Sequence, residues 1–220
     1  METLADRYWY PLYAYLRREG NTADDAADLV QGFLADLLRR PEIGEPDAGR
    51  GKFRTFLLVR LRSHARDRWR RERNSEKRGK GYEFVPLDFD VAETCYGRET
   101  SEHASPQVLF DHAWARAVLA AARERVRSDM IDRGKGQWFA RLEWILDDAG
   151  GGARGYSDIA RHLQTSESNV KVVALRMRKR FTEAVLAILR AEQGMGVLGE
   201  IPDYLIAEDD VKDSAALVRL

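Results

Sequence analysis

The sequence predicts an all-α protein made of two small helical domains joined by a linker. Apolar residues recur three and four positions apart over most of the 220 residues, which is the period of an amphipathic helix. This period is lost where glycine and acidic residues gather, and that loss predicts a linker. The composition, 44% hydrophobic and 33% charged, suits a helical protein with a real core. The expected divisions are a first domain at 1–78, a linker at 79–105, a second domain at 106–190 and a C-terminal extension at 191–220.

Three helices are expected in the first domain. Apolar residues four apart over Leu4–Leu16 predict the first helix, which Gly20 breaks. Thr22 suits the N-cap of the second helix, which carries a wide apolar face and is closed by Pro41. After a loop, Phe53–Lys77 predicts a third helix, which is apolar at its start and almost wholly polar beyond its middle.

The second domain is also expected to be helical. Pro106 suits the first position of a helix over about 107–127, and another is expected over about 137–147. A glycine-rich run then predicts a turn. Tyr156–Val185 has the layout of a short helix, a tight turn and a longer basic helix, which is the layout of a DNA-reading helix-turn-helix.

Charge is segregated along the chain, although its formal net charge is zero. Arg50–Lys80 holds 13 Lys and Arg against three acids, a net charge of +10. Ala191–Leu220 holds seven acids against two basic residues, a net charge of −5. Such asymmetry can steer charged partners even when the total charge is zero.

The helix-turn-helix prediction specifies which side chains face inward. Ile159, Ala160 and Leu163 are expected to face the core, Gln164 and Thr165 to make the turn, and Ser166 to cap the longer helix. The buried stripe of that helix is expected to comprise Val170, Ala174 or Val173, Met177 and Phe181. The opposite face would then contact phosphates and base edges in a major groove. The alternative is an ordinary amphipathic hairpin with a solvated basic face.

The upstream basic helix predicts a second nucleic-acid surface. Five arginines surround one aromatic residue, Trp69: Arg66, Arg68, Arg70, Arg71 and Arg73. Arginines bind phosphates, and an aromatic ring among them can support an unstacked base. The alternative is a solvated helix end with Trp69 packed on a neighbouring helix.

Acidic residues mark the exposed side of the second helix. Asp25, Asp28 and Asp36 lie there, with Gln31 between them. They predict either a surface that docks on a basic partner protein or simply a soluble face whose first acids complement the helix dipole.

Several other functions are disfavoured. The single cysteine, Cys95, leaves no internal disulfide and suits a reducing cytoplasm. With four scattered histidines it gives no metal-ligand spacing, so no metal, cofactor or catalytic residue is expected. No apolar run approaches the roughly 20 residues that span a bilayer, and no export signal is recognised, so a cytoplasmic location is expected. An enzyme that acts on nucleic acid could use metal gathered by Asp24, Asp25 and Asp28, but no second carboxylate or histidine group in a comparable context supports such a site.

Three segments match the motifs of a known family, in that family's order. DAADLVQGFLADLL (25–38) looks like its region 2.2, FRTFLLVRLRSHARDRWRRER (53–73) like regions 2.3 and 2.4, and YSDIARHLQTSESNVKVVALRMRKRF (156–181) like region 4.2. The chain therefore resembles bacterial RNA polymerase sigma factors of the extracytoplasmic-function (ECF) class, with a lengthened region 4 and a C-terminal extension.

The resemblance implies a protein without enzymatic activity whose partners are core RNA polymerase and promoter DNA. It places at or just behind the polymerase-docking surface Asp25, Asp28, Leu29, Gln31 and Phe33. It assigns opening of the minus-ten element and capture of a flipped base to Arg54, Arg62, Ser63, His64, Asp67, Trp69, Arg70 and Arg71. It assigns reading of the minus-thirty-five duplex to Ser168, Asn169, Lys171, Val172, Leu175, Arg176 and Lys179.

The chain departs from the family's motifs at two functional positions. Ser63 and His64 replace the usual asparagine and its neighbour, which predicts an unusual minus-ten preference. Residues 172–175 (VVAL) replace a commoner polar sequence, so direct readout by polar groups is expected from Ser168, Asn169, Lys171 and Arg176.

Two functions stay open from the sequence. One is a sigma factor, and the other is a stand-alone helix-turn-helix regulator that never engages polymerase; stable binding to core polymerase separates them. An anti-sigma protein, or the chain's own extension at 191–220, is a further candidate partner as a regulator. The alternative for the extension is a cap on the region 4 core or a disordered tail.

Overall fold

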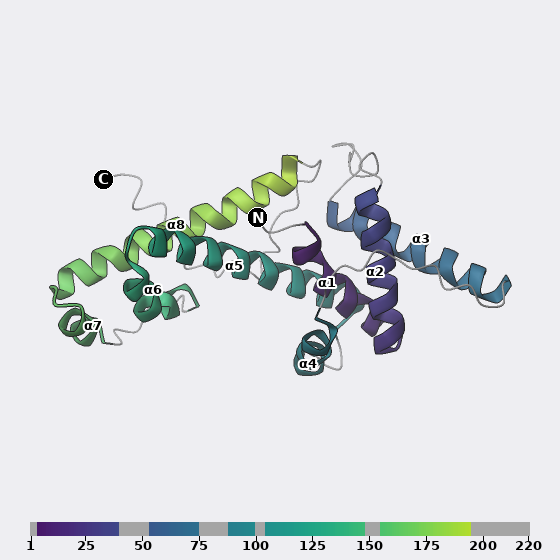
Figure 1. Cartoon of the computed structure of the whole chain (residues 1–220), viewed down its shortest axis with the longest axis horizontal. Coiled ribbons are helices and arrows are strands. Elements are labelled where there is room, and N and C mark those ends of the chain that lie inside the picture. Colours follow the sequence, from purple (N-terminus) through teal and green to yellow (C-terminus); the bar gives the residue numbers. More distant parts are fainter. Residues whose placement is uncertain (1–3, 40–52, 75–87, 100–103, 148–154, 195–220) are drawn as a thin grey trace. The chain divides into compact units, whose positions relative to one another are not determined.

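The computed structural model describes residues 4–39, 53–74, 88–99, 104–147 and 155–194. Within these ranges the regular elements are all helices, so the predicted all-α class is confirmed. They are α1 (Leu4–Arg18), α2 (Ala23–Arg39), α3 (Phe53–Asn74), α4 (Phe89–Glu99), α5 (Pro106–Asp132), α6 (Gly136–Leu142), the short 3₁₀ helix η2 (Glu143–Leu146), α7 (Tyr156–His162) and α8 (Glu167–Gly194) (Figure 1).

Packing divides the described residues into two units. The first unit takes its residues from Met1–Val118 and Ala191–Gly199, and the second from Leu119–Arg190. The long helices α5 and α8 therefore contribute residues to both units. The functional division at 1–78 and 106–190 stays a prediction, because this packing groups the first half of α5 with α1 to α4.

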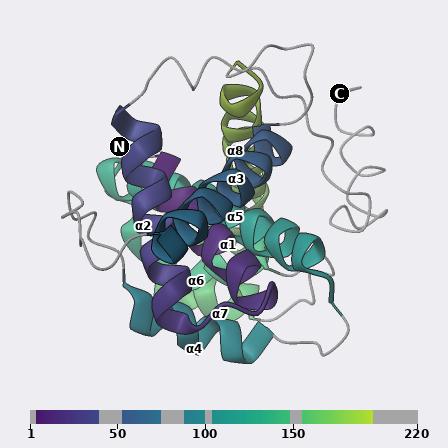
Figure 2. The ribbon, with the colours of Figure 1, turned by 90° about the vertical axis from the view of Figure 1, so that its right-hand side faces the viewer.

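The core of the first unit is built on α1. Helix α2 packs along α1, α3 packs against α2, and α4 packs against α1 (Figure 1 and Figure 2). Tyr8, Leu12 and Leu16, which recur at helical spacing in α1, are buried. The Tyr8 ring meets the Phe53 ring of α3 edge-on with centroids 5.6 Å apart. Burying each large side chain of this kind contributes about 1.5–3 kcal/mol. The largest fully buried side chains of this unit are Tyr8, Tyr13, Tyr15, Phe110, Leu12, Leu29, Leu34, Leu57 and Leu61.

Helix starts follow the capping rules. The Thr22 hydroxyl accepts a 3.1 Å hydrogen bond from the backbone N–H of Asp25, so Thr22 caps α2 as predicted. The Ser105 hydroxyl accepts from the N–H of Val108 at 3.3 Å, and Pro106 is the first residue of α5. This helix runs to Asp132, five residues beyond its expected end.

The segment 79–105 differs from the irregular linker expected there. Residues 89–99 form α4, whose first turn is capped by the Asp88 carboxylate at 3.1 Å from the N–H of Val91. The Phe89 ring packs edge-on against the Trp9 ring of α1, with centroids 5.7 Å apart. The expectation of a segment without helix is therefore wrong for 89–99, because contacts with α1 stabilise a helix whose own periodicity is weak. The rest of the linker, 79–87 and 100–103, lies outside the described residues.

The second unit packs α6, η2, α7 and most of α8 with the second half of α5. Its buried residues include Val126, Met130, Phe139, Leu142, Ile145, Ile159, Val170 and Met177. An ion pair joins Arg180 of α8 to Asp129 of α5 at 2.9 Å, and the Arg178 Nε donates to the Ile145 carbonyl at 3.4 Å. Most of the extension, 195–220, lies outside the described residues. Among the helices described, none combines the length and the apolar character needed to span a bilayer.

Candidate nucleic-acid interface

The outer face of α3 is basic and carries an exposed aromatic ring. The Trp69 residue is 54% exposed, so it is not the packed residue of the alternative interpretation. One turn away, an open hollow of about 320 Å³ is lined by Ser63, Arg66, Asp67 and Arg70. Exposed arginines beside an exposed indole are the groups that bind a single-stranded nucleic acid.

Within this hollow, one acid orients a cation. The Asp67 carboxylate accepts a 2.5 Å hydrogen bond from the Arg70 guanidinium, three residues along the same helix. The Arg66 Nε instead donates to the Arg62 carbonyl, one turn earlier on α3, at 3.2 Å. Each of these two guanidinium groups is therefore held by one hydrogen bond on the surface of α3.

Arg62 lies on the same helix and is anchored from α1. Its Nε donates to the Tyr15 hydroxyl at 2.5 Å, and its guanidinium carbon lies 5.3 Å from the centre of the Tyr15 ring. The Glu19 carboxylate is 4.0 Å away. Arg62 is exposed. Tyr15 of α1 therefore fixes the position of a guanidinium that is still accessible to solvent.

Arg54 differs from the other predicted minus-ten residues because it is buried. It is 5% exposed, and its guanidinium donates to the Asp111 carboxylate at 3.3 Å and lies 3.8 Å from the centre of the Trp114 ring. These contacts give Arg54 a packing role in the first unit, where it joins α3 to α5. Its contact with DNA stays a prediction, and nothing in its geometry supports it.

His64 lies between α2 and α3 rather than on the outer face. Its ring meets the Phe33 ring with centroids 6.0 Å apart, and its Nδ1 is 3.4 Å from the Asp36 carboxylate. The neighbouring Ser63 is exposed. The side chain of Arg71 lies outside what the structure describes.

The acidic face of α2 adjoins the basic face of α3. Asp25 and Asp28 are exposed, Gln31 is half-buried, and Leu29 and Phe33 are core residues. Arg68 donates to the Asp28 carboxylate at 3.1 Å, so the predicted polymerase-docking acid is bound by an arginine next to Trp69. Arg68 lies on the predicted basic helix, but no local pattern in the sequence indicates its partner 40 residues away.

Helices α7 and α8 adopt the predicted short helix, turn and long helix. Ile159 and Ala160 are buried, and Leu163 is half-buried. The Ser166 hydroxyl accepts from the N–H of Asn169 at 3.2 Å, which confirms the predicted N-cap of α8. Gln164, in the turn, has a φ of +49°, in the left-handed region where glycine is favoured.

The two faces of α8 also divide as predicted. Val170, Ala174 and Met177 are buried, and Phe181 is half-buried. The opposite face is exposed and contains every residue assigned to the minus-thirty-five duplex: Ser168, Asn169, Lys171, Val172, Leu175, Arg176 and Lys179. The Asn169 amide donates to the Thr165 hydroxyl at 2.9 Å, and Lys171 pairs with Glu167 at 2.7 Å.

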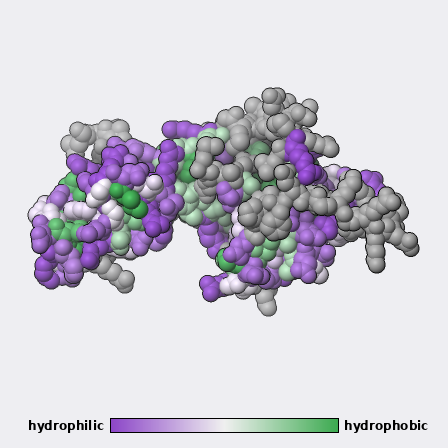
Figure 3. All heavy atoms as spheres, in the orientation of Figure 1, coloured by the Kyte–Doolittle hydropathy of each residue, from purple (hydrophilic) through white to green (hydrophobic). Residues whose placement is uncertain are grey.

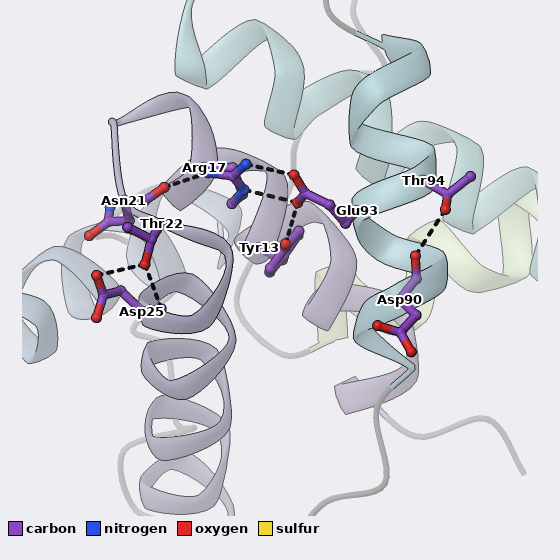
Figure 4. Close-up of polar contacts among 8 residues, drawn as sticks. All are labelled: Tyr13, Arg17, Asn21, Thr22, Asp25, Asp90, Glu93 and Thr94. Atoms are coloured by element: carbon purple, nitrogen blue, oxygen red, sulfur yellow. Dashed lines mark hydrogen bonds and ion pairs between the residues drawn. The ribbon is translucent and has the colours of Figure 1, made fainter.

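A partly buried polar network that the sequence did not predict holds α4 on α1. The Glu93 carboxylate accepts from the Tyr13 hydroxyl at 2.5 Å and from two nitrogens of Arg17 at 2.9 and 2.6 Å (Figure 4). The hydrogen bond from Arg17, then that from Tyr13, holds the pKa of the Glu93 carboxyl below its usual range against the opposing effect of burial. Burial and the Glu93 carboxylate raise the pKa of the Tyr13 hydroxyl.

The network extends to the start of α2. Arg17 also donates to the Asn21 carbonyl at 2.6 Å, and its guanidinium carbon lies 5.0 Å from the centre of the Tyr96 ring. One arginine therefore joins the end of α1 to the loop before α2 and to Glu93 and Tyr96, which lie one turn apart on α4. Within the described residues no group of acids, histidines or cysteines could hold a metal ion.

A known protein family matches the segment that forms α1 to α3. Residues 4–75 match the family model of sigma-70 region 2. The match supports a sigma-70 family member and, in general terms, the role of an RNA polymerase sigma factor, a non-enzymatic factor of transcription initiation. No curated protein and no solved structure matches the chain.

The region 2 match begins and ends with the three helices that carry the acidic and basic faces. It starts at the first residue of α1 and stops one residue after α3. A sigma-70 region 2 implies binding to core RNA polymerase and to promoter DNA. The ECF subclass, a region 4 in α7 and α8, and the role of each residue go beyond this match.

Proposed function

We propose that the chain is an ECF-type sigma factor that binds core RNA polymerase and directs it to a two-part promoter. In this proposal α2 docks on the polymerase, the outer face of α3 opens the minus-ten element, and α8 reads the minus-thirty-five duplex. The observation that carries it is the juxtaposition, within the region 2 match, of an exposed acidic face on α2 with the exposed Trp69 and arginines of α3.

Charge supports the assignment of the two faces to two partners. Asp25 on α2 is exposed and would meet a basic protein surface, whereas the hollow on α3 holds Arg66 and Arg70 and would meet phosphates. Trp69 supplies a flat apolar surface on which one unstacked base can rest. Binding to phosphates alone would not require an exposed aromatic ring, so Trp69 favours contact with a base.

The helical pair α7 and α8 supports a second DNA contact. Ser166 fixes the start of α8, and the exposed face that follows carries three cations, Lys171, Arg176 and Lys179. A regulator with this pair alone would bind duplex DNA too. The region 2 match is what favours a sigma factor over such a regulator.

Reconstitution with core polymerase tests the proposal. The purified chain is mixed with bacterial core enzyme, co-elution is measured, and transcripts from genomic fragments are sequenced to map start sites. We expect stable co-elution and defined starts. Absence of core binding, both for the full chain and after removal of residues 195–220, would favour the stand-alone regulator instead.

A charge-reversal pair sharpens this test. Asp25→Lys places a cation on the proposed docking face, and we expect it to weaken binding to core polymerase by about tenfold. Asp90→Lys reverses an acid on α4 that is also exposed, and it is expected to leave core binding unchanged. Equal effects of the two variants would remove the docking role of the α2 face.

A further inference from the structure

The exposed face of α8 carries two apolar side chains where polar ones would be expected. Val172 is 42% exposed and Leu175 is 50% exposed, although both lie on the face opposite the buried stripe of the helix. Three residues apart in a helix, they are neighbours on one surface. Single exposed apolar residues are ordinary, but these two form a pair inside a set of cations.

The surroundings of this pair restrict what can cover it. Lys171, Arg176 and Lys179 are exposed on the same helix, and hydrophobic atoms lie among hydrophilic ones where α7 and the first turns of α8 meet (Figure 3). An apolar protein surface would remove these cations from water without offering them an acceptor of its own, which is unfavourable. A duplex offers phosphates to the cations and, between its backbones, the base edges to the apolar pair.

Base edges in the major groove present one apolar group, the C5-methyl of thymine. Valine and leucine side chains can neither donate nor accept a hydrogen bond, so they cannot read the other edge groups. We propose that Val172 and Leu175 read thymine methyl groups in the duplex element that α8 contacts. This inference rests on the proposed function of α8 and adds to it the chemical basis of its sequence preference.

The spacing of the pair makes the inference more specific. Three residues of helix rise about 4.5 Å, which is close to the roughly 3.4 Å that separates adjacent base pairs along one strand. Val172 and Leu175 therefore suit thymines at neighbouring base pairs. Asn169, one turn earlier and held by its bond to Thr165, is placed to read polar edges beside them.

Deoxyuridine tests this directly, because it lacks only the methyl group of thymine. The probe is a duplex from the upstream part of a promoter mapped by the reconstitution, with each thymine replaced in turn, and the protein is the full chain in its complex with core polymerase. We expect one or two positions at which the replacement weakens binding about fourfold. This change corresponds to roughly 0.8 kcal/mol, the value for burying one methylene-sized apolar group.

Variants connect those positions to the two side chains. Val172→Ser and Leu175→Ser are each expected to abolish the preference for thymine over deoxyuridine at one position, and the double variant at every such position. Leu186→Ser, at a 40% exposed leucine on the same helix, should keep the discrimination. If no thymine position matters, or if the serine variants still discriminate, the inference is overturned while promoter binding itself stands. If the serine variants lose core binding without DNA, the pair is a polymerase contact and the inference is equally overturned. A chain that binds neither core polymerase nor any duplex would overturn both this inference and the proposed function.

Discussion

The guanidinium carbon of Arg54 lies 3.8 Å from the centre of the Trp114 ring, and a nitrogen of the same group donates to Asp111 at 3.3 Å. Both partners belong to the first half of α5, so Arg54 fastens the start of α3 to that helix within the first unit. The charge of Arg54 is therefore engaged by an acid and an aromatic ring within the protein. Its motif position predicted DNA binding, whereas its contacts indicate a structural role.

Replacing Arg54 is therefore expected to lower stability. Arg54→Met removes the cation and leaves the partly buried Asp111 without its partner, and we expect the free energy of unfolding to fall by about 2–4 kcal/mol. Urea denaturation followed by circular dichroism measures it. Arg60→Met is the control, because Arg60 is exposed and its guanidinium lies 5.9 Å from the centre of the Phe56 ring. Its effect should stay within about 0.5 kcal/mol. Unchanged stability of Arg54→Met together with weakened DNA binding would restore the DNA-contact role.

The contact of Glu93 with Arg17 and Tyr13 predicts a dependence of stability on pH. The pKa of the Glu93 carboxyl is lower in the folded protein than in the unfolded chain. Its stabilising contribution is therefore present above the unfolded pKa, about 4.3, and is lost as the pH falls through the lower folded pKa. Because the Glu93 side chain is 41% exposed, solvent screens the contribution, which we expect to be about 1 kcal/mol.

Glu93→Gln tests that contribution. The variant should be less stable than the wild type at pH 7, and the difference should shrink between about pH 5 and pH 3. Hydrogen exchange of the α4 amides should speed up in the variant at pH 7, because its docking on α1 is weakened. Asp90→Asn on the same helix is the matched control, since Asp90 points away from Arg17 (Figure 4). A constant difference across the pH range would mean that the Glu93 charge does not stabilise the docked helix.

The elements that the sequence predicted well are those with local signals. The starts of α2, α5 and α8 follow from Thr22, Ser105 and Ser166, whose hydroxyls accept hydrogen bonds from backbone groups three residues ahead. The two faces of α8 follow from a 3.6-residue period that needs no knowledge of its neighbours.

The features that the sequence could not predict depend on partners far along the chain. Helix α4 is short and weakly periodic, and its docking on α1 joins Glu93 to Arg17, 76 residues away. The position of Arg54 in the motif predicted a DNA contact, whereas in the structure Arg54 binds Asp111 of α5, 57 residues away. No local pattern of residue types reports such pairings, so the candidate site was predicted as a set of residues on helices and not as the contacts between them.

The exposed indole of α3 predicts a specific loss in DNA opening. Trp69→Ala should leave the stability nearly unchanged, because the ring is 54% exposed. It should weaken binding of the polymerase complex to a single-stranded minus-ten oligonucleotide by about 5- to 150-fold, the loss of one base–aromatic stack of roughly 1–3 kcal/mol. Val59→Ala alters another exposed residue of α3, 56% accessible, and should leave this affinity intact. If both variants bind as the wild type does, base stacking on α3 is not part of promoter opening.

The backbone of Gln164 predicts how the turn before α8 responds to substitution. Its φ of +49° is unfavourable for side chains that branch at Cβ, so Gln164→Val should lower the free energy of unfolding by about 1–2 kcal/mol. Gln164→Gly removes the steric strain but adds freedom to the unfolded chain, and these effects of roughly 1 kcal/mol each nearly cancel. Urea denaturation separates the two variants, and duplex binding adds a second readout, because a displaced turn shifts the whole reading face of α8. We expect the glycine variant to bind duplex DNA like the wild type and the valine variant to bind it more weakly. If both variants have the same stability and the same affinity for the duplex, the turn does not require the left-handed conformation in solution.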